Sequence, residues 1–149
     1  MVNLLAFDLG ATSGRAVVGR FSGEKLTLQE IHRFPNTPVQ LGKHLYWDFL
    51  NIYRQVETGL LKAYQHDLTL ASLGIDSWGV DFGLISQQGD LLGNPIHYRD
   101  YQTDGIMEKV FALVPREVIF QRTGIQFMQI NTLYHLYAMQ ISQSPVLEK

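Results

Sequence analysis

The first third of the chain alternates short apolar runs with turn residues. Strands are expected over residues 4–9, 16–21 and 26–34. Small and hydroxylated residues between the first two runs, Gly10 to Gly14, suit a tight turn, and residues 22–24 suit a second one. This pattern predicts a three-stranded antiparallel meander.

The pattern then changes to a helical period. Pro35, Pro38 and Gly42 are expected to leave a loop, after which Asp48 can cap a helix. Apolar residues recur in this segment at spacings of three and four, which predicts an amphipathic helix with one buried face. The residues of that face are Phe49, Tyr53, Val56, Leu60 and Tyr64.

The remaining pattern predicts two strands followed by three short helices. The strands are expected over 70–77 and 80–86, before a polar turn at 87–90. One helix is indicated by Ile106, Val110 and Leu113, one should open at Pro115, and one should be capped by Asn131. Ser144-Pro145 has the chemistry of a further helix start, which favours a truncated chain, with a frayed natural tail as the alternative. With no repeat or linker-like tract, residues 1–149 are expected to form one partial α/β domain.

Composition and charge exclude several classes of partner. The chain has 149 residues, 46% of them hydrophobic, and a formal net charge of −2 from 12 basic and 14 acidic residues. This balance gives no reason to expect nucleic acid or an anionic membrane as a partner. There is no cysteine, which fits a reducing compartment, and we expect a cytoplasmic protein. The apolar run before Asp8 is too short for a signal peptide or a membrane span.

The segment from Asp8 to Arg15 is the strongest candidate for chemistry. Its turn places backbone N–H groups and two hydroxyls where phosphate oxygens can accept hydrogen bonds, and Arg15 adds a positive charge. Asp8 would repel phosphate and is better suited to hold Mg²⁺, directly or through water. The segment matches neither the P-loop nor the dinucleotide-binding pattern. An ordinary glycine-rich hairpin remains the alternative.

Asp8-Leu9-Gly10-Ala11-Thr12-Ser13-Gly14-Arg15 resembles the first phosphate motif of the FGGY carbohydrate kinases, and its ending resembles their rhamnulokinase branch. Further similar segments are residues 74–82, 98–100, 121–127 and 131–134. The resemblance implies an actin-like, RNase H-like α/β fold with a mixed sheet that begins with an antiparallel meander. It also implies ATP and Mg²⁺ as cofactors. The implied ATP phosphate-binding residues are Gly10, Ala11, Thr12, Ser13, Gly14 and Arg15, with Asp8 at the metal.

The resemblance places the sugar, most closely L-rhamnulose, near the residues that follow the strand over 70–77. The implied substrate-binding residues are Gly79, Trp78, Asp81, Arg99 and Asp100. An indole can pack on the apolar face of a sugar, a glycine allows close backbone approach, and a carboxylate can bind hydroxyls. The alternatives are that Trp78 belongs to the core and that Arg99 and Asp100 form a solvated pair. The five histidines show no metal-ligand spacing.

The resemblance also implies that essential parts lie beyond Lys149. No catalytic residue is assigned in this chain, because the family's catalytic base and its C-terminal, nucleotide-binding half come later. The isolated chain is therefore expected to be inactive, with an open sheet edge and exposed apolar surface. Fuculokinase or xylulokinase activity, a noncatalytic remnant or interaction module, and an RNase H-like nuclease are the alternatives. The last lacks the basic surface that a nucleic-acid partner requires.

Overall fold

The computed structural model describes residues 1–66 and 69–148. The chain divides into two compact units, the first made of Met1–Pro38 with Asp48–Gly79 and the second of Val39–Trp47 with Val80–Lys149. The sequence pattern gives no sign of this division, because the residues around Pro38, Trp47 and Gly79 form no linker-like tract.

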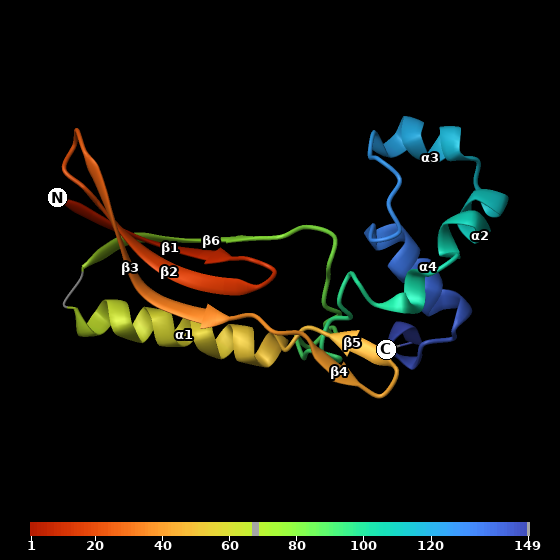
Figure 1. The fold of residues 1–149 in the computed structure, drawn as a ribbon, viewed down its shortest axis with the longest axis horizontal. Helices are drawn as coiled ribbons and strands as arrows, with labels where there is room; N and C mark the ends of the chain where they lie inside the picture. The colour runs from red at the N-terminus through yellow and green to blue at the C-terminus, as the bar shows by residue number, and fades with distance from the viewer. Residues whose placement is uncertain (67–68, 149) are drawn as a thin grey trace. The chain divides into compact units, whose positions relative to one another are not determined.

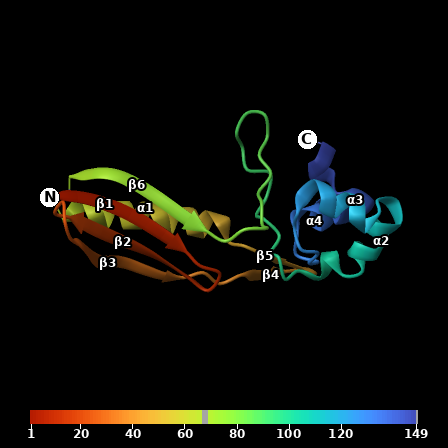
Figure 2. The ribbon, with the colours of Figure 1, turned by 90° about the horizontal axis from the view of Figure 1, so that it is seen from above.

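The first unit is built on a four-stranded mixed sheet. Its strands are β1 (Val2–Leu9), β2 (Ser13–Phe21), β3 (Leu26–Pro35) and β6 (Leu70–Ser77). They lie in the order β3-β2-β1-β6, which Figures 1 and 2 show. Pairing is antiparallel from β1 to β2 and from β2 to β3, and parallel from β1 to β6. The predicted antiparallel meander and mixed sheet are confirmed.

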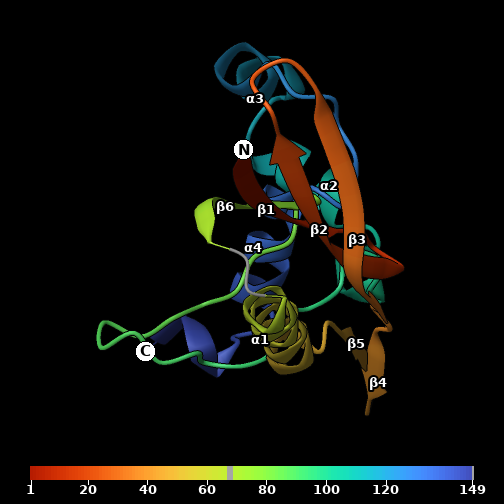
Figure 3. The ribbon, with the colours of Figure 1, turned by 90° about the vertical axis from the view of Figure 1, so that its left-hand side faces the viewer.

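Helix α1 (Phe49–Gln65) packs on one side of this sheet (Figure 3). Asp48 caps it as predicted, since the Asp48 Oδ1 atom accepts a hydrogen bond from the Asn51 N–H at 3.1 Å. Burial of apolar side chains between the helix and the sheet forms the core of this unit. The buried residues of that core are Leu5, Phe7, Ala16, Val18 and Ala63.

The face of α1 that packs on the sheet differs from the predicted one. The buried residues of the helix are Ile52, Gly59 and Ala63. Of the predicted face only Val56 packs against the core; Phe49, Tyr53, Leu60 and Tyr64 are 37–80% exposed. The prediction was wrong because apolar residues lie on more than one side of this helix. The side with small residues, Gly59 and Ala63, packs on the sheet because it lets the helix backbone come close to the strands.

Strand β6 leaves one edge of the described sheet open. It pairs with β1 on one side only, and Leu73 and Ile75 on it are 45% and 55% exposed. Their register partners on β1, Leu5 and Phe7, are buried under α1. The expected open edge with exposed apolar side chains is therefore present in the described structure.

The second unit combines a small hairpin with short helices. The hairpin joins β4 (Val39–Leu41) to β5 (His44–Tyr46), in a segment predicted to be a loop. The helices are α2 (Ile106–Leu113), α3 (Arg116–Thr123) and α4 (Thr132–Ile141), with the 3₁₀ turns η1 (Tyr101–Thr103) and η2 (Pro145–Glu148). The three predicted helices are confirmed, and the helix start at Ser144-Pro145 is one 3₁₀ turn. The core of α2 and α4 consists of Ile106, Val110, Tyr134 and Ala138.

The strand predicted over 80–86 does not form. This segment belongs to a long irregular loop, drawn in green in Figure 2, in which Ile85 and Leu91 form a single bridge across the predicted polar turn. Val80 interrupts the extended conformation with a φ of 74°. Among the residues that the structure describes, no helix combines the length and the apolar character that crossing a bilayer requires.

Replacing Gly59 tests the packing of α1. A Cβ at this position would lie 2.6 Å from Cε1 of Phe7 and 3.0 Å from Cβ of Ala16. Gly to Ala inside a helix normally stabilises by about 1 kcal/mol, but here we expect Gly59→Ala to destabilise by about 1–3 kcal/mol, because both neighbours are buried. Urea unfolding measures the change, with Gly74→Ala as control because a Cβ there meets nothing within 4 Å. Stabilisation by Gly59→Ala would contradict this packing.

Candidate active site

The predicted phosphate turn follows β1. Asn36, which the sequence pattern did not indicate, forms hydrogen bonds to two carbonyl groups of this turn. The Gly10 N–H donates to the Ser13 carbonyl at 3.0 Å, which closes the turn. Asn36, which is 5% exposed, donates its backbone N–H to the Thr12 carbonyl at 3.0 Å and its Nδ2–H to the Gly10 carbonyl at 2.9 Å. The carbonyl groups of Gly10, Thr12 and Ser13 are thus engaged by the protein, and nothing in the spacing of the sequence indicates this role of Asn36.

The donors of the turn are left available. Within residues 1–66 and 69–148, the backbone N–H groups of Ala11 and Thr12 and the hydroxyls of Thr12 and Ser13 make no hydrogen bond. Consecutive free N–H groups in a turn form a concavity that binds anions. The turn can therefore accept phosphate oxygens without breaking an existing contact. Gly14 lies against the Phe34 ring, where a Cβ would clash with Cζ of Phe34.

The two charged residues that flank the turn contact each other. Arg15 Nε and Nη2 both donate to Oδ2 of Asp8, at 2.9 and 2.6 Å, and both side chains are nearly half exposed. Asp76 on β6 is the register partner of Asp8, so two carboxylates stand at neighbouring positions of the parallel strands. Among the described residues no group of three or more His, Cys, Asp or Glu forms a metal cage. Asp8 can therefore supply one carboxylate to a cation whose other ligands come from elsewhere.

The parallel pairing of β1 with β6 brings Trp78-Gly79, the start of the predicted sugar-binding segment, to the same sheet edge as the phosphate turn. Leu9 pairs with Ser77, so the phosphate turn and Trp78-Gly79 both leave the sheet at the carboxyl ends of adjacent parallel strands. Ligands of open α/β sheets bind at such an edge. A Cβ on Gly79 would meet nothing within 4 Å, so this glycine is not required by packing in the described structure.

In the second unit, Asp81 and Arg99 lie around a cluster of aromatic rings. The Trp47 Nε1–H donates to Oδ2 of Asp81 at 2.6 Å, and Trp47 stacks on His97 at 4.1 Å between ring centroids. The Arg99 guanidinium lies 5.2 Å from the centre of the Tyr98 ring, a cation–π contact. The structure therefore brings these two predicted residues to one cluster, while Trp47 and His97 were not predicted.

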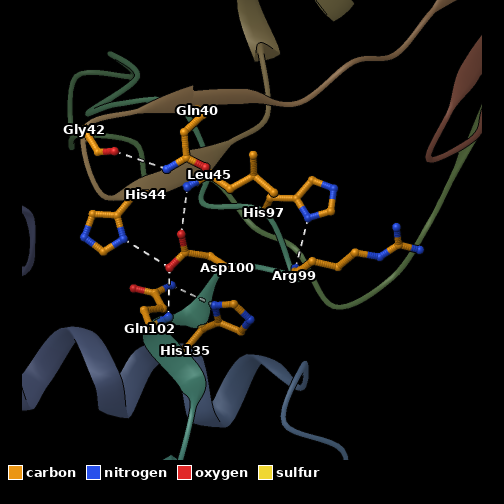
Figure 4. Close-up of polar contacts among 9 residues, drawn as sticks. All are labelled: Gln40, Gly42, His44, Leu45, His97, Arg99, Asp100, Gln102 and His135. Atoms are coloured by element: carbon orange, nitrogen blue, oxygen red, sulfur yellow. Dashed lines mark hydrogen bonds and ion pairs between the residues drawn. The ribbon is translucent and has the colours of Figure 1, made fainter.

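Asp100 is a buried residue of the same unit, and its carboxylate connects several segments through hydrogen bonds (Figure 4). It is 3% exposed, and its Oδ1 contacts His44 Nδ1 at 3.1 Å and accepts from the Gln102 N–H at 2.9 Å. Its Oδ2 accepts from the Leu45 N–H at 2.7 Å. These contacts tie β5 to η1, so the alternative of a solvated Arg99–Asp100 pair is excluded, and both carboxylate oxygens already have protein partners.

Burial favours the neutral form of two histidines of this unit. Burial lowers the pKa of His97 and of His135, and this effect outweighs the opposing attraction of Asp81 and Asp100. His135 Nδ1 lies 2.8 Å from Nε2 of Gln102 (Figure 4). Burial also raises the pKa of the Tyr134 hydroxyl. The second unit therefore contains buried groups whose charged forms are disfavoured.

Removing the Asn36 side chain tests the support of the phosphate turn. Asn36→Ala leaves the Gly10 carbonyl without its donor, so we expect a loss of about 1–3 kcal/mol in unfolding free energy. Thermal unfolding measures the loss, and Thr37→Ala, at an exposed neighbour, is the control. Equal stability of the two variants would contradict the anchoring role of Asn36.

The buried histidines predict a dependence of stability on pH. Because the folded pKa values lie below the ordinary value of about 6.5, the unfolded chain binds more protons, and stability falls as pH drops below that value and is complete above it. Urea unfolding between pH 8 and pH 5 measures this slope, which His135→Gln should reduce. His66→Gln, at an exposed position, is the control. A wild-type slope that His135→Gln leaves unchanged would refute the assignment to His135.

No family model matches the chain. The chain is 46% identical to a rhamnulokinase of Mannheimia succiniciproducens, 42% to one of Bacteroides thetaiotaomicron and 48% to one of Pectobacterium carotovorum. These matches cover 92–98% of the chain but only 28–30% of the relatives' length.

Solved structures show the same fold at low sequence identity. A ligand-bound xylulose kinase from Lactobacillus acidophilus matches with a TM-score of 0.84 at 16% identity, over 100% of this chain and 30% of that one. Plasmodium falciparum glycerol kinase with ADP matches with a TM-score of 0.78 at 16% identity and the same coverage. The chain is therefore similar in sequence to proteins named rhamnulokinases over nearly all of its own length, and similar in fold to solved sugar kinases, while it spans less than a third of the length of either.

Proposed function

We propose that the protein that carries this chain transfers a phosphoryl group from ATP to L-rhamnulose, giving L-rhamnulose 1-phosphate. The observation that carries the proposal is the match to proteins named rhamnulokinases over more than nine-tenths of the chain. Residues 1–149 would form part of the N-terminal domain of such a kinase, with the remaining part and a C-terminal half supplied by further sequence. A sugar kinase that consumes ATP is expected in the cytoplasm.

The phosphate turn would contribute hydrogen-bond donors to the nucleotide. The free N–H groups of Ala11 and Thr12 and the hydroxyls of Thr12 and Ser13 can bind phosphate oxygens. Gly10 and Gly14 shape the turn, and Arg15 can add a positive charge when it turns from Asp8 to the phosphates. Such fixed donors favour the charge that spreads over the oxygens during transfer.

Magnesium fits the residues present as a cation held only in part by this chain. Asp8 offers a half-exposed carboxylate whose Oδ1 makes no hydrogen bond within the described residues, and the phosphates and water would complete the coordination. When bound, the ion would neutralise phosphate charge. Arg15 already neutralises Asp8 in the structure, so the side chain of Arg15 would have to share or leave this carboxylate.

The sugar would lie at the carboxyl end of β6. Gly79 supports this place because its backbone is open, and Trp78 beside it offers an apolar ring face. Asp81 and Arg99 are the further sugar-binding residues that the family resemblance implies. The Asp100 carboxylate is engaged by His44, Leu45 and Gln102, so we propose that it acts on the sugar by fixing the residues around it.

This chain supplies binding groups but no assigned base. Phosphoryl transfer to a hydroxyl needs a group that accepts the proton of that hydroxyl, and the family resemblance assigns no residue of this chain to that role. We therefore expect the isolated chain to show no turnover with ATP, Mg²⁺ and L-rhamnulose. The same observation keeps a noncatalytic interaction module as the second candidate.

A chimera tests the proposal. Residues 1–149 are joined to the remaining part of the Mannheimia succiniciproducens rhamnulokinase, and ATP consumption is measured with L-rhamnulose, L-fuculose and D-xylulose. We expect turnover with a preference for L-rhamnulose. Replacing the two turn hydroxyls, Thr12→Ala with Ser13→Ala, should raise the KM for ATP about tenfold, and the exposed Thr27→Ala is the control.

Each other outcome contradicts a different part of the proposal. Preference for L-fuculose or D-xylulose would overturn the substrate. A folded chimera without turnover would favour the noncatalytic module. An unchanged KM for ATP in the doubly substituted turn would remove the phosphate-binding role of Thr12 and Ser13. Turnover by the isolated chain would show that it contains the base.

A further inference from the structure

Val80, which directly follows Trp78-Gly79, has an unusual backbone conformation. Its φ is 74°, and Gln143, at 53°, is the one other non-glycine residue with a positive φ among those that the structure describes. A β-branched side chain in this region is strained, because its Cβ crowds the neighbouring backbone. Such a conformation persists only where surrounding contacts hold it.

Thr132, an exposed residue, makes a hydrogen bond to the backbone of Val80. The Thr132 hydroxyl donates to the Val80 carbonyl at 2.9 Å, across 52 positions of the sequence. Thr132 is the first residue of α4, and this helix is fixed in the core of the second unit by the buried side chains of Tyr134 and Ala138. The hydroxyl therefore acts from a packed helix on an irregular loop.

The end of α4 is arranged differently from the sequence prediction. Asn131 occupies the cap position, but its side chain makes no capping bond and its Nδ2–H donates instead to the Gln126 carbonyl at 2.8 Å. This contact fixes the segment before the helix. It leaves the Thr132 side chain, directly after the cap, as the group that reaches Val80.

The hydrogen bonds of the segment leave specific donors open. The Val80 carbonyl is occupied by Thr132, and the next side chain, Asp81, is held by Trp47 at 2.6 Å. The backbone N–H groups of Gly79 and Val80 make no hydrogen bond within residues 1–66 and 69–148. Adjacent free N–H groups next to a left-handed residue are suited to bind an oxygen atom.

We propose that Thr132 is a positioning residue for the sugar, which holds Val80 in the left-handed conformation and so presents the Gly79 and Val80 N–H groups to a ketose oxygen. The inference rests on the proposed function, because it takes the ketose as the ligand of this segment. Thr132 itself need not touch the sugar. Its hydroxyl acts through the backbone of Val80.

The experiment uses the complete 149-residue chain, labelled with ¹⁵N and ¹³C, and L-rhamnulose as the probe. Backbone chemical shifts of Val80 report its conformation, and titration reports the affinity through the Gly79 and Val80 amides. Thr132→Val removes the hydroxyl at nearly constant volume, and Thr132→Ser keeps it. We expect Thr132→Val to move the Val80 shifts away from left-handed values and to weaken binding about five- to tenfold, while Thr132→Ser preserves both.

A glycine at position 80 provides an independent test. Glycine adopts a positive φ without strain, so in a Val80→Gly background Thr132→Val should weaken binding less than it does in the wild type. A merely structural role of Thr132 would change the melting temperature but not this difference between the two backgrounds.

The contrary outcomes are distinguishable. Equal affinity of folded Thr132→Val and Thr132→Ser would overturn the positioning role and leave the proposed function standing. Left-handed Val80 shifts that persist in Thr132→Val would overturn the holding contact. A wild-type chain whose Gly79 and Val80 amides do not respond to L-rhamnulose would overturn the sugar contact of this segment, whatever the activity of the chimera.

Discussion

The parallel pairing of β1 with β6 is the constraint on which the candidate site depends. The two strands run in the same direction, with residues 4–9 of β1 paired to residues 72–77 of β6. Their carboxyl ends therefore meet at one edge of the sheet. The phosphate turn leaves β1 there, and Trp78-Gly79 leaves β6 beside it. Two segments about 70 positions apart in sequence are thus brought together by backbone hydrogen bonds, before any side chain contributes.

Three polar residues, of which Asn36 and Asp100 are buried and Thr132 is exposed, then contact the irregular segments. Asn36 satisfies the carbonyls of the phosphate turn, Asp100 joins β5 to η1, and Thr132 holds the Val80 carbonyl. In each case a side chain takes up backbone groups that regular secondary structure would otherwise pair. The consequence in the turn and at Val80 is the same, since carbonyl groups are engaged and N–H donors remain for a ligand.

Local patterns predicted those elements whose order is set within a few residues. The alternation of the meander, the Asp48 cap of α1 and the three short helices of the second half all appeared as expected. Predictions failed where a distant neighbour decides. The buried stripe of α1 follows from the approach of Gly59 to Phe7. Among the described residues, the segment over 80–86 has no strand to pair with beyond the single Ile85–Leu91 bridge. The β4–β5 hairpin was missed because each strand has three residues.

The sequence by itself determined the class of the fold and the chemical character of the site. The spacing of apolar residues specified strands and helices, and the order of residues from Asp8 to Arg15, with the later similar segments, pointed to a sugar kinase. Only the tertiary structure decided which of these groups are engaged. It paired Arg15 with Asp8, buried Asp100 among protein donors, and revealed Asn36 and Thr132 as supports. The reason is physical: a hydrogen bond between residues far apart in the chain depends on how the elements pack, and residue order does not encode it locally.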